Sequence, residues 1–344
     1  MGLNDEIFEQ PEALDRLLNS ELTNIRLIAE TIRNRDIRLV YIIARGSSDN
    51  AGLYAKYLFG IANKLPVAMA LPSLFTLYGS PPNLSNTLTI AISQSGESPD
   101  IVSALEEGRR QGATTVAITN TPASPLGQAA EFCVNLHAGE EHAIAATKTY
   151  TTELLAIAML SATLAEDGAR LEALNGIPDL AKQALLSNDA IAAATQRFRY
   201  MSQCVVLGRG YNYATAYEWS LKLKELAYIV AEPYSSADFQ HGPIAIVERG
   251  FPVMAVITEG AVAKEVTALC RRLVEEKEAE LVVLSNVESA LALGRTPIAL
   301  PAMGEWLSPI ISMIPAQLFC LHLTLTKGYD AEHPRGLTKL TETR

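Results

Sequence analysis

The chain has 344 residues, of which 49% are hydrophobic and 19% charged, enough apolar material for the cores of about two domains. This composition excludes a disordered or low-complexity protein. Lys and Arg number 28 against 38 for Asp and Glu, a formal net charge of −10. That balance argues against a nucleic-acid-binding surface, which depends on clustered cations. A small anionic ligand is not excluded, because its binding is a local property.

Three features bear on the compartment. The N-terminal segment is acidic and has no basic region followed by an apolar core, so we expect no signal peptide. Residues 306–326 carry no Asp, Glu, Lys or Arg and could span a bilayer, but two prolines, Gln317 and His322 favour a buried helix. Cysteines occur far apart, without zinc-ligand spacing, at Cys133, Cys204, Cys270 and Cys320. We expect a cytoplasmic protein with buried thiols, no membrane contact and no metal site.

The first elements along the chain alternate between helix and strand. Apolar residues at helical spacing predict an amphipathic helix over 12–34. Residues 39–44 are a short β-branched run that ends in a Gly/Ser turn, which predicts a buried strand. A second strand over 88–92, a helix near 99–111 and a third strand over 115–118 follow. This alternation predicts an α/β fold with a mainly parallel sheet and helices on both faces, in three layers.

The second half of the chain echoes the first. Arg45 and Arg209 follow similar strands at an offset of 164 residues, and 89–93 and 115–120 match 253–257 and 281–286 at nearly the same offset. Chance similarity between buried strands is the alternative, but three pairs at nearly one offset favour an internal duplication. We expect an N-terminal helical segment, two α/β domains and a tail, with bounds 1–36, 37–180, 195–326 and 327–344.

The sharpest local signal is the segment 92–100, Ile-Ser-Gln-Ser-Gly-Glu-Ser-Pro-Asp. Pro99 suits the first position of a helix, and Ser98 before it suits the N-cap. A helix N-terminus with three nearby hydroxyls can hold a phosphate without basic residues. An ordinary polar loop with a capped helix is the alternative. The matching loop, residues 258–261, has one hydroxyl and an acid, so only the first half is expected to bind an anion.

Two glycine-containing turns were weighed as nucleotide sites. Residues 45–48, Arg-Gly-Ser-Ser, could add donors at the end of the first strand, where ligands bind in such sheets. The dinucleotide fingerprint is incomplete in both halves: residues 208–213 lack its third glycine and residues 46–48 its second. We therefore expect no nucleotide cofactor.

Three further segments carry ionisable groups suited to proton transfer. Glu218, Lys222 and Glu225 share one face of a predicted helix, although composition alone favours a solvated face with ion pairs. His241 beside Gly-Pro is more often a turn residue, and Lys339 near the end is usually a surface charge. Beside a phosphate loop, these groups supply a cation, a carboxylate and an imidazole for moving protons in a phosphorylated sugar.

Four motifs in order resemble proteins with two sugar-isomerase (SIS) domains: Ser-Gln-Ser-Gly-Glu at 93–97, Leu-Lys-Leu-Lys-Glu at 221–225, His-Gly-Pro at 241–243 and Pro-Arg-x-Leu-x-Lys at 334–339. The isomerase half of glucosamine-6-phosphate synthase is the most similar, and residues 6–11 resemble the segment that opens it. The resemblance runs from about residue 6 to 344. It implies two SIS domains, sugar-phosphate chemistry and no cofactor.

The resemblance also implies roles for individual residues. The base that enolises the sugar falls on Glu225, the ring-opening histidine on His241, and the Schiff-base lysine on Lys339. In this family the histidine comes from the neighbouring subunit of a homodimer. The implied phosphate contacts are Ser48, Ser93, Gln94, Ser95 and Ser98. The implied contacts nearer the sugar are Glu141, Ile144, Glu218 and Lys222.

Departures from the synthase pattern bear on the substrate. Ala146 stands where the synthase has Ser, and Thr338 where it has Ala, which leaves the exact sugar phosphate open. The glutaminase half requires a cysteine directly after the initiator Met, whereas this chain has Gly2, so we expect no glutamine hydrolysis. The chain then resembles the SIS-type glucosamine-6-phosphate deaminases, which implies hydrolysis of glucosamine 6-phosphate to fructose 6-phosphate and ammonia.

Two alternatives remain at this point. One is another enzyme on the same scaffold, either an aldose–ketose isomerase or a fructosamine-phosphate deglycase. The other is a non-enzymatic sugar-phosphate sensor, which needs the serine loop but neither Glu225 nor Lys339.

Overall fold

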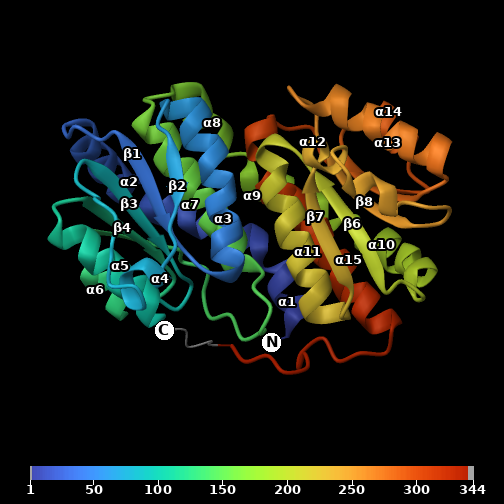
Figure 1. Ribbon diagram of the computed structural model, residues 1–344, viewed down its shortest axis with the longest axis horizontal. Helices are drawn as coiled ribbons and strands as arrows, with labels where there is room; N and C mark the ends of the chain where they lie inside the picture. The colour runs from blue at the N-terminus through green and yellow to red at the C-terminus, as the bar shows by residue number, and fades with distance from the viewer. Residues whose placement is uncertain (1, 340–344) are drawn as a thin grey trace. The chain divides into compact units, whose positions relative to one another are not determined.

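The computed structural model describes residues 2–339 (Figure 1), so the last five residues of the expected tail lie outside the described chain. The chain divides into two compact units. What we call the first unit comprises Gln10–Glu141, Lys148–Pro178 and 338–339. The second unit comprises 2–9, His142–Thr147 and Asp179–Leu337. Each is described here by itself.

The first unit contains a parallel five-stranded sheet in the order β2-β1-β3-β4-β5. Every residue of its central strands β3 and β4 is buried, as expected for apolar runs covered on both faces. The strands are β1 (Leu39–Ile43), β2 (Val67–Met69), β3 (Thr87–Ile92), β4 (Thr114–Thr119) and β5 (Phe132–Asn135).

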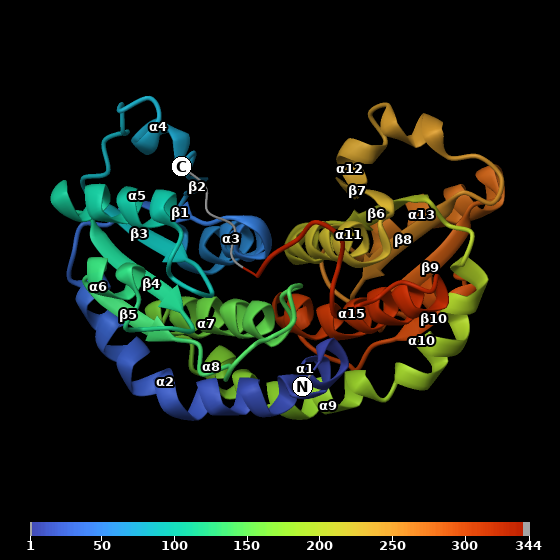
Figure 2. The same cartoon turned by 90° about the horizontal axis from the view of Figure 1, so that it is seen from below.

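Helices cover both faces of this sheet, which Figure 2 shows as three layers. One face carries α4 (Ser73–Thr76), α5 (Pro99–Arg110) and α6 (Pro125–Ala129). The other face carries α2 (Gln10–Arg33), α3 (Gly46–Leu58) and α7 (Lys148–Leu164). Three shorter helices continue the chain after α7: α8 (Gly168–Leu174), α9 (Ile177–Leu185) and α10 (Asn188–Thr195).

The second unit repeats this plan in a parallel sheet of order β10-β9-β8-β6-β7. Helices α13 and α14 pack on one face, and α11 and α15 on the other. The strands are β6 (Gln203–Gly208), β7 (Val230–Ser235), β8 (Pro252–Ile257), β9 (Glu280–Ser285) and β10 (Thr296–Ala299). Besides α10 and most of α9, whose bounds are given above, the helices of this unit are α1 (Leu3–Phe8), α11 (Tyr213–Ala227), α12 (Ser236–Phe239), α13 (Ala263–Lys277), α14 (Glu288–Leu291) and α15 (Ser308–Thr326).

Topology and side chains both confirm the predicted duplication. Read from β7, the second sheet has the same order as the first sheet read from β2. An ion pair is repeated as well: Arg45 contacts Asp100 in the first unit, and Arg209 contacts Glu265 in the second. The predicted α/β fold with two related domains is therefore confirmed.

The apolar stretch near the C-terminus is a core helix, as predicted. Residues 305–326 are the one helical stretch of the described chain long and apolar enough to cross a membrane, yet 83% of its most apolar window is buried. Within the core, the Phe319 ring lies 5.6 Å from that of Phe198 and 5.7 Å from that of Trp219, both nearly edge-on.

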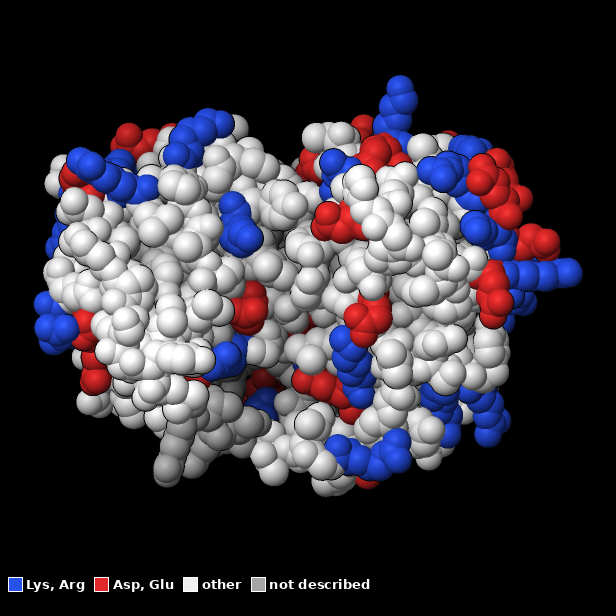
Figure 3. Space-filling model, in the orientation of Figure 1, with Lys and Arg blue, Asp and Glu red and all other residues white. Residues whose placement is uncertain are grey.

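Charged side chains of both signs are interspersed on the face shown in Figure 3. Along α13, Arg271 pairs with Glu275 and Arg272 with Glu276. This face therefore lacks the continuous basic field that nucleic-acid binding uses.

Candidate functional site

The loop after β3, residues 93–98, is called the serine loop here. The Ser93 hydroxyl accepts a hydrogen bond from the N–H of Gly96 at 3.2 Å, and the Ser95 hydroxyl accepts from the N–H of Glu97 at 3.3 Å. Gly96 has φ +67°, and a Cβ there would lie 2.0 Å from Ser124 Oγ, so only glycine fits. The loop is thus a tight, hydroxyl-lined turn that presents backbone N–H groups.

Ser98 and Pro99 occupy the positions predicted for them, at the N-cap and first residue of α5. The predicted capping bond is absent, however, because the Ser98 side chain accepts none from the helix. Its hydroxyl therefore remains available for a ligand beside the positive end of a 12-residue helix.

Arg45 was considered as an extra donor for an anion, but its guanidinium is already paired. Its Nε and Nη2 each lie 2.9 Å from Asp100 Oδ2, and the Asp100 side chain is fully buried. The backbone oxygen of Gln94 accepts from the N–H of Asn120 at 3.1 Å. These contacts fix the serine loop between β1, β4 and α5 rather than offering charge to a ligand.

Ser48, in the first turn of α3, points its hydroxyl into the interior of the first unit. The hydroxyl donates to Glu153 Oε1 at 2.8 Å, and both residues are buried. A hydroxyl has one proton, so Ser48 can donate to a phosphate only if it turns away from Glu153. Sequence analysis missed Glu153, although it is the sole charged residue in the segment 149–165.

Glu141 and Lys339 are brought together in the first unit. Glu141 Oε2 accepts from Lys339 Nζ at 2.9 Å and from Thr149 Oγ1 at 2.8 Å, while Oε1 accepts from the N–H of Thr149 at 3.1 Å. The Glu141 side chain is fully buried, and that of Lys339 is 28% exposed. Glu141 therefore anchors the lysine and the start of α7, and the neighbouring Thr338 is exposed.

A buried ion cluster lies on α11 in the second unit. Lys222 Nζ lies 2.5 Å from Glu225 Oε2 and 3.4 Å from Glu218 Oε1. The side chains of Glu218 and Lys222 are 0% and 2% exposed, so the prediction of a solvated face is wrong. The face is buried because α11 packs against its neighbouring strands β6 and β7 and against α15, which is distant in sequence.

The members of the cluster are suited to different chemical roles. Burial lowers the pKa of Lys222, but the Glu218 and Glu225 carboxylates raise it by more, so the net pKa is well above lysine's ordinary value. Lys222 is thus a fixed cation rather than a proton shuttle. Glu225 is the exposed member of the cluster, with 23% of its side chain accessible. One oxygen is held by Lys222 while the carboxylate faces outward, which suits a general base.

His241 follows α12 and is exposed. Its backbone N–H donates to the oxygen of Asp238 at 3.0 Å, and Gly242 after it adopts φ +132°. Among the described residues, no hydrogen bond or ion pair joins its imidazole to the carboxylates of α11. The structure of this single chain therefore does not bring His241 to the cluster.

The segment His142–Thr147, which holds Ile144 and Ala146, belongs to the second unit. The N–H groups of His142 and Ala143 donate to the fully buried Glu6 carboxylate on α1. Gln317 Nε2 of α15 donates to the Thr147 oxygen at 3.3 Å. Ile144 and Ala146 are half-buried.

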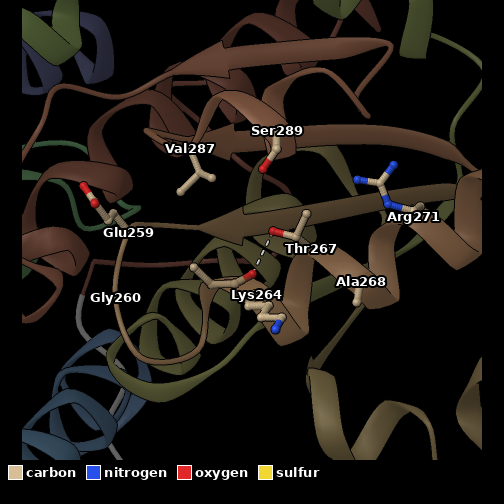
Figure 4. Close-up of a pocket in the computed structure, with 9 residues that line it drawn as sticks. Glu259, Gly260, Lys264, Thr267, Ala268, Arg271, Val287 and Ser289 are labelled. Carbon is tan, nitrogen blue, oxygen red and sulfur yellow. Dashed lines mark hydrogen bonds between the residues drawn. The ribbon is translucent and has the colours of Figure 1, made fainter.

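A cavity of about 500 Å³ lies on α13 and in the loops after β8 and β9 (Figure 4). It is lined by none of the predicted site residues, and its two cations, Lys264 and Arg271, are exposed. Arg271 also pairs with Glu275 at 3.7 Å. This open cavity is not the candidate site.

Metal and thiol chemistry find no support in residues 2–339. No three His, Cys, Asp or Glu side chains there gather as a metal site. All four cysteines are free thiols, and burial raises the pKa of Cys133 to about 11 and that of Cys204 and Cys270 to about 12. Such thiols are poor nucleophiles.

The fold is thus a duplicated α/β scaffold with a hydroxyl-lined loop at a helix N-terminus in one unit and a buried carboxylate–lysine cluster in the other. The chain belongs to the SIS domain family, whose model matches residues 35–162 and 199–327.

Three similar proteins illustrate this membership. Glutamine–fructose-6-phosphate aminotransferase of Bacteroides thetaiotaomicron is 33% identical over 97% of this chain, which spans 57% of that protein's length. A Silicibacter pomeroyi DSS-3 structure, provisionally described as a phosphosugar isomerase, is 33% identical with a TM-score of 0.85, covering 96% of this chain and 100% of that one. The C-terminal domain of the aminotransferase from Francisella tularensis is 28% identical with a TM-score of 0.87, covering 96% and 98%.

Proposed function

We propose that this chain is an isomerising deaminase that converts glucosamine 6-phosphate and water to fructose 6-phosphate and ammonia. The observation that carries the proposal is Glu225, a partly exposed carboxylate held by a buried lysine. Moving a proton between adjacent sugar carbons requires one base of this kind.

The serine loop supplies the phosphate contacts in this proposal. Its N–H groups and the uncommitted hydroxyl of Ser98 suit a dianion at the start of α5. Ser93, Gln94 and Ser95 line the same turn, and Ser48 joins them once its hydroxyl leaves Glu153. A phosphate held here fixes one end of the substrate, so that binding energy orients the reacting carbons.

Proton transfer is assigned to α11. In the open-chain sugar, Glu225 removes the proton from C2 and returns it to C1, which converts the amino aldose to a ketose imine at C2. Water adds to that imine carbon, and ammonia leaves to give the ketone of fructose 6-phosphate. The fixed charge of Lys222, balanced by Glu218, holds one oxygen of Glu225 and so orients the carboxylate through this cycle.

The remaining assignments follow the family pattern. His241 assists opening of the pyranose and is supplied by a second copy of the chain in a homodimer. Lys339, held by Glu141, either forms a transient imine with the ketose or stabilises the enolate. Ile144, Ala146 and Thr338 border the sugar. The reaction requires no cofactor or metal, and we place it in the cytoplasm, with a sugar phosphate rather than a nucleic acid or membrane as partner.

Ammonia release from glucosamine 6-phosphate, with fructose 6-phosphate assayed alongside, tests the proposal. Glu225→Gln should lower kcat by about 10²–10⁴-fold, the usual contribution of a general base. Glu276→Gln, on the exposed side of α13, is the matched control and should leave turnover unchanged. Equal turnover of Glu225→Gln and the parent would refute the assigned base. Binding of the sugar phosphate without ammonia release would refute the deaminase and favour an isomerase, a deglycase or a sensor.

A further inference from the structure

Helix α11 ends in an unusual way. Its C-cap residue, Tyr228, has φ +56° and ψ +36°, and its N–H donates to the Leu223 oxygen. This left-handed conformation is normally left to glycine, because a Cβ there crowds the following carbonyl group. A tyrosine at this place costs stability, so its side chain is expected to supply something that glycine cannot.

That side chain holds the C-terminal tail. The N–H of Arg335 donates to Tyr228 Oη at 2.8 Å, and the Arg335 guanidinium carbon lies 3.7 Å from the centroid of the Tyr228 ring. The Tyr329 ring lies 5.0 Å from the Tyr228 ring and 5.5 Å from the same guanidinium carbon. We call Tyr228, Tyr329 and Arg335 the tail clasp.

Apart from the clasp, the tail is held by side-chain contacts and by the burial of Ala331 and Pro334. Residues 328–337 form no helix or strand, and residues 335–337 are exposed. One further anchor lies earlier, where the Glu332 carboxylate accepts from the N–H of Leu3 at 2.9 and 3.0 Å. A segment without a backbone ladder depends on such side-chain contacts for its order. Arg335 of the clasp lies between Glu332 and Lys339 in the chain.

We propose that Tyr228 and Arg335 are positioning residues that tie the lysine-bearing tail to the helix bearing the base. Tyr228 follows Glu225 by three residues, and Arg335 precedes Lys339 by four. The clasp therefore fixes the chain next to both groups without touching the reacting atoms. This inference rests on the proposed function for its catalytic meaning, whereas the holding of the tail stands apart from any activity.

The test exploits the strained conformation. Tyr228→Gly relieves the left-handed strain while removing the ring, so the melting temperature should stay the same or rise while the tail is released. Glu278→Gly is the matched control, because Glu278 is the C-cap of α13 with φ +50° and is exposed. It should also keep or raise the melting temperature but leave the tail held. Tyr228→Phe keeps the ring and removes only the hydroxyl.

Tail release is measured as the rate at which trypsin cleaves after Arg335, followed by mass spectrometry of the intact chain. We expect cleavage about tenfold faster in Tyr228→Gly, because one hydrogen bond and one cation–π contact are lost. Tyr228→Phe should fall between it and the parent, and Glu278→Gly should match the parent. Equal cleavage of Tyr228→Gly and the parent would overturn the clasp.

The kinetics of ammonia release from glucosamine 6-phosphate test whether the clasp contributes to catalysis. Arg335→Ala should lower kcat about tenfold with little change in KM, since the phosphate contacts lie elsewhere, and Arg335→Lys should restore part of the loss. Full turnover in Arg335→Ala would overturn the positioning role. A parent protein that releases no ammonia would refute the proposed function instead and leave the cleavage result standing.

Discussion

The loop after β3 and the loop after β8 occupy the same place in the two units, but their backbone N–H groups donate to different acceptors. In the described chain, no carboxylate accepts from the N–H groups of residues 93–98. The hydroxyls of Ser93 and Ser95 accept from two of them, and the Ile118 oxygen accepts from that of Ser93. In the second unit, the N–H of Ala261 donates to Glu305 Oε2 at 2.9 Å. The second loop therefore contains its own anion, whereas the first is left open to an external one.

The helices that follow the first strand of each unit also differ, and here the charged residues belong to the second unit. An offset of 164 residues, as between Arg45 and Arg209, places Tyr54, Leu58 and Ile61 opposite Glu218, Lys222 and Glu225. The duplicated scaffold thus carries the serine loop in one copy and an ion cluster in the other. In the proposed function, the first copy binds the phosphate and the second moves protons.

The largest effect on the comparison of the two loops is expected from substituting the glycine in each loop. Gly96→Ala should weaken fructose 6-phosphate binding by tenfold or more, because a Cβ would displace Ser124 and disturb N–H contacts worth about 1.5–3 kcal/mol each. Gly260→Ala forces a similar clash, with Glu305 Oε2 at 2.2 Å, yet should leave binding unchanged. Isothermal titration of both variants measures the difference.

The melting temperatures of both variants show whether each still folds. Ser95→Ala is a further control, because it removes one hydroxyl without a clash. Comparable affinity losses in Gly96→Ala and Gly260→Ala would mean that the two loops do not differ as described.

Much of this comparison could be predicted from sequence. The strands and helices follow local patterns, and the offset between Arg45 and Arg209 exposed the duplication. The serine loop was recognisable because its residue types and its Ser-Pro helix start are local properties.

Burial was the part that local patterns could not predict. The face bearing Glu218 and Lys222 is polar in sequence and is buried only because α15 and β7 pack over it. The hydroxyl of Ser48 is taken by Glu153, 105 residues away. Tyr228 likewise gave no signal, because its strain and its contact with Arg335 exist only in the folded chain.

An intermediate effect is expected at the repeated ion pair. Asp100 is fully buried beside Arg45, whose side chain is 49% exposed, so Asp100→Asn should destabilise by about 2 kcal/mol, less than a fully buried pair would lose. The equivalent pair is 36% and 40% exposed, so Glu265→Gln should cost below about 1 kcal/mol. Urea unfolding followed by circular dichroism compares the two. Equal losses would show that burial does not distinguish the pairs.

The smallest effect is expected from removing the Glu305 carboxylate, which accepts from the second loop. Glu305→Ala leaves the N–H of Ala261 without its acceptor and should lower the free energy of unfolding by about 1 kcal/mol. Because the lost group is a carboxylate, acetate should restore part of the melting temperature of Glu305→Ala and have less effect on the parent. Glu305→Gln keeps an acceptor without the charge and should lie between the two. If acetate shifts the melting temperatures of the variant and the parent equally, Glu305 acts only through packing. The difference between the two loops would then need a reason other than the presence of a carboxylate in one of them.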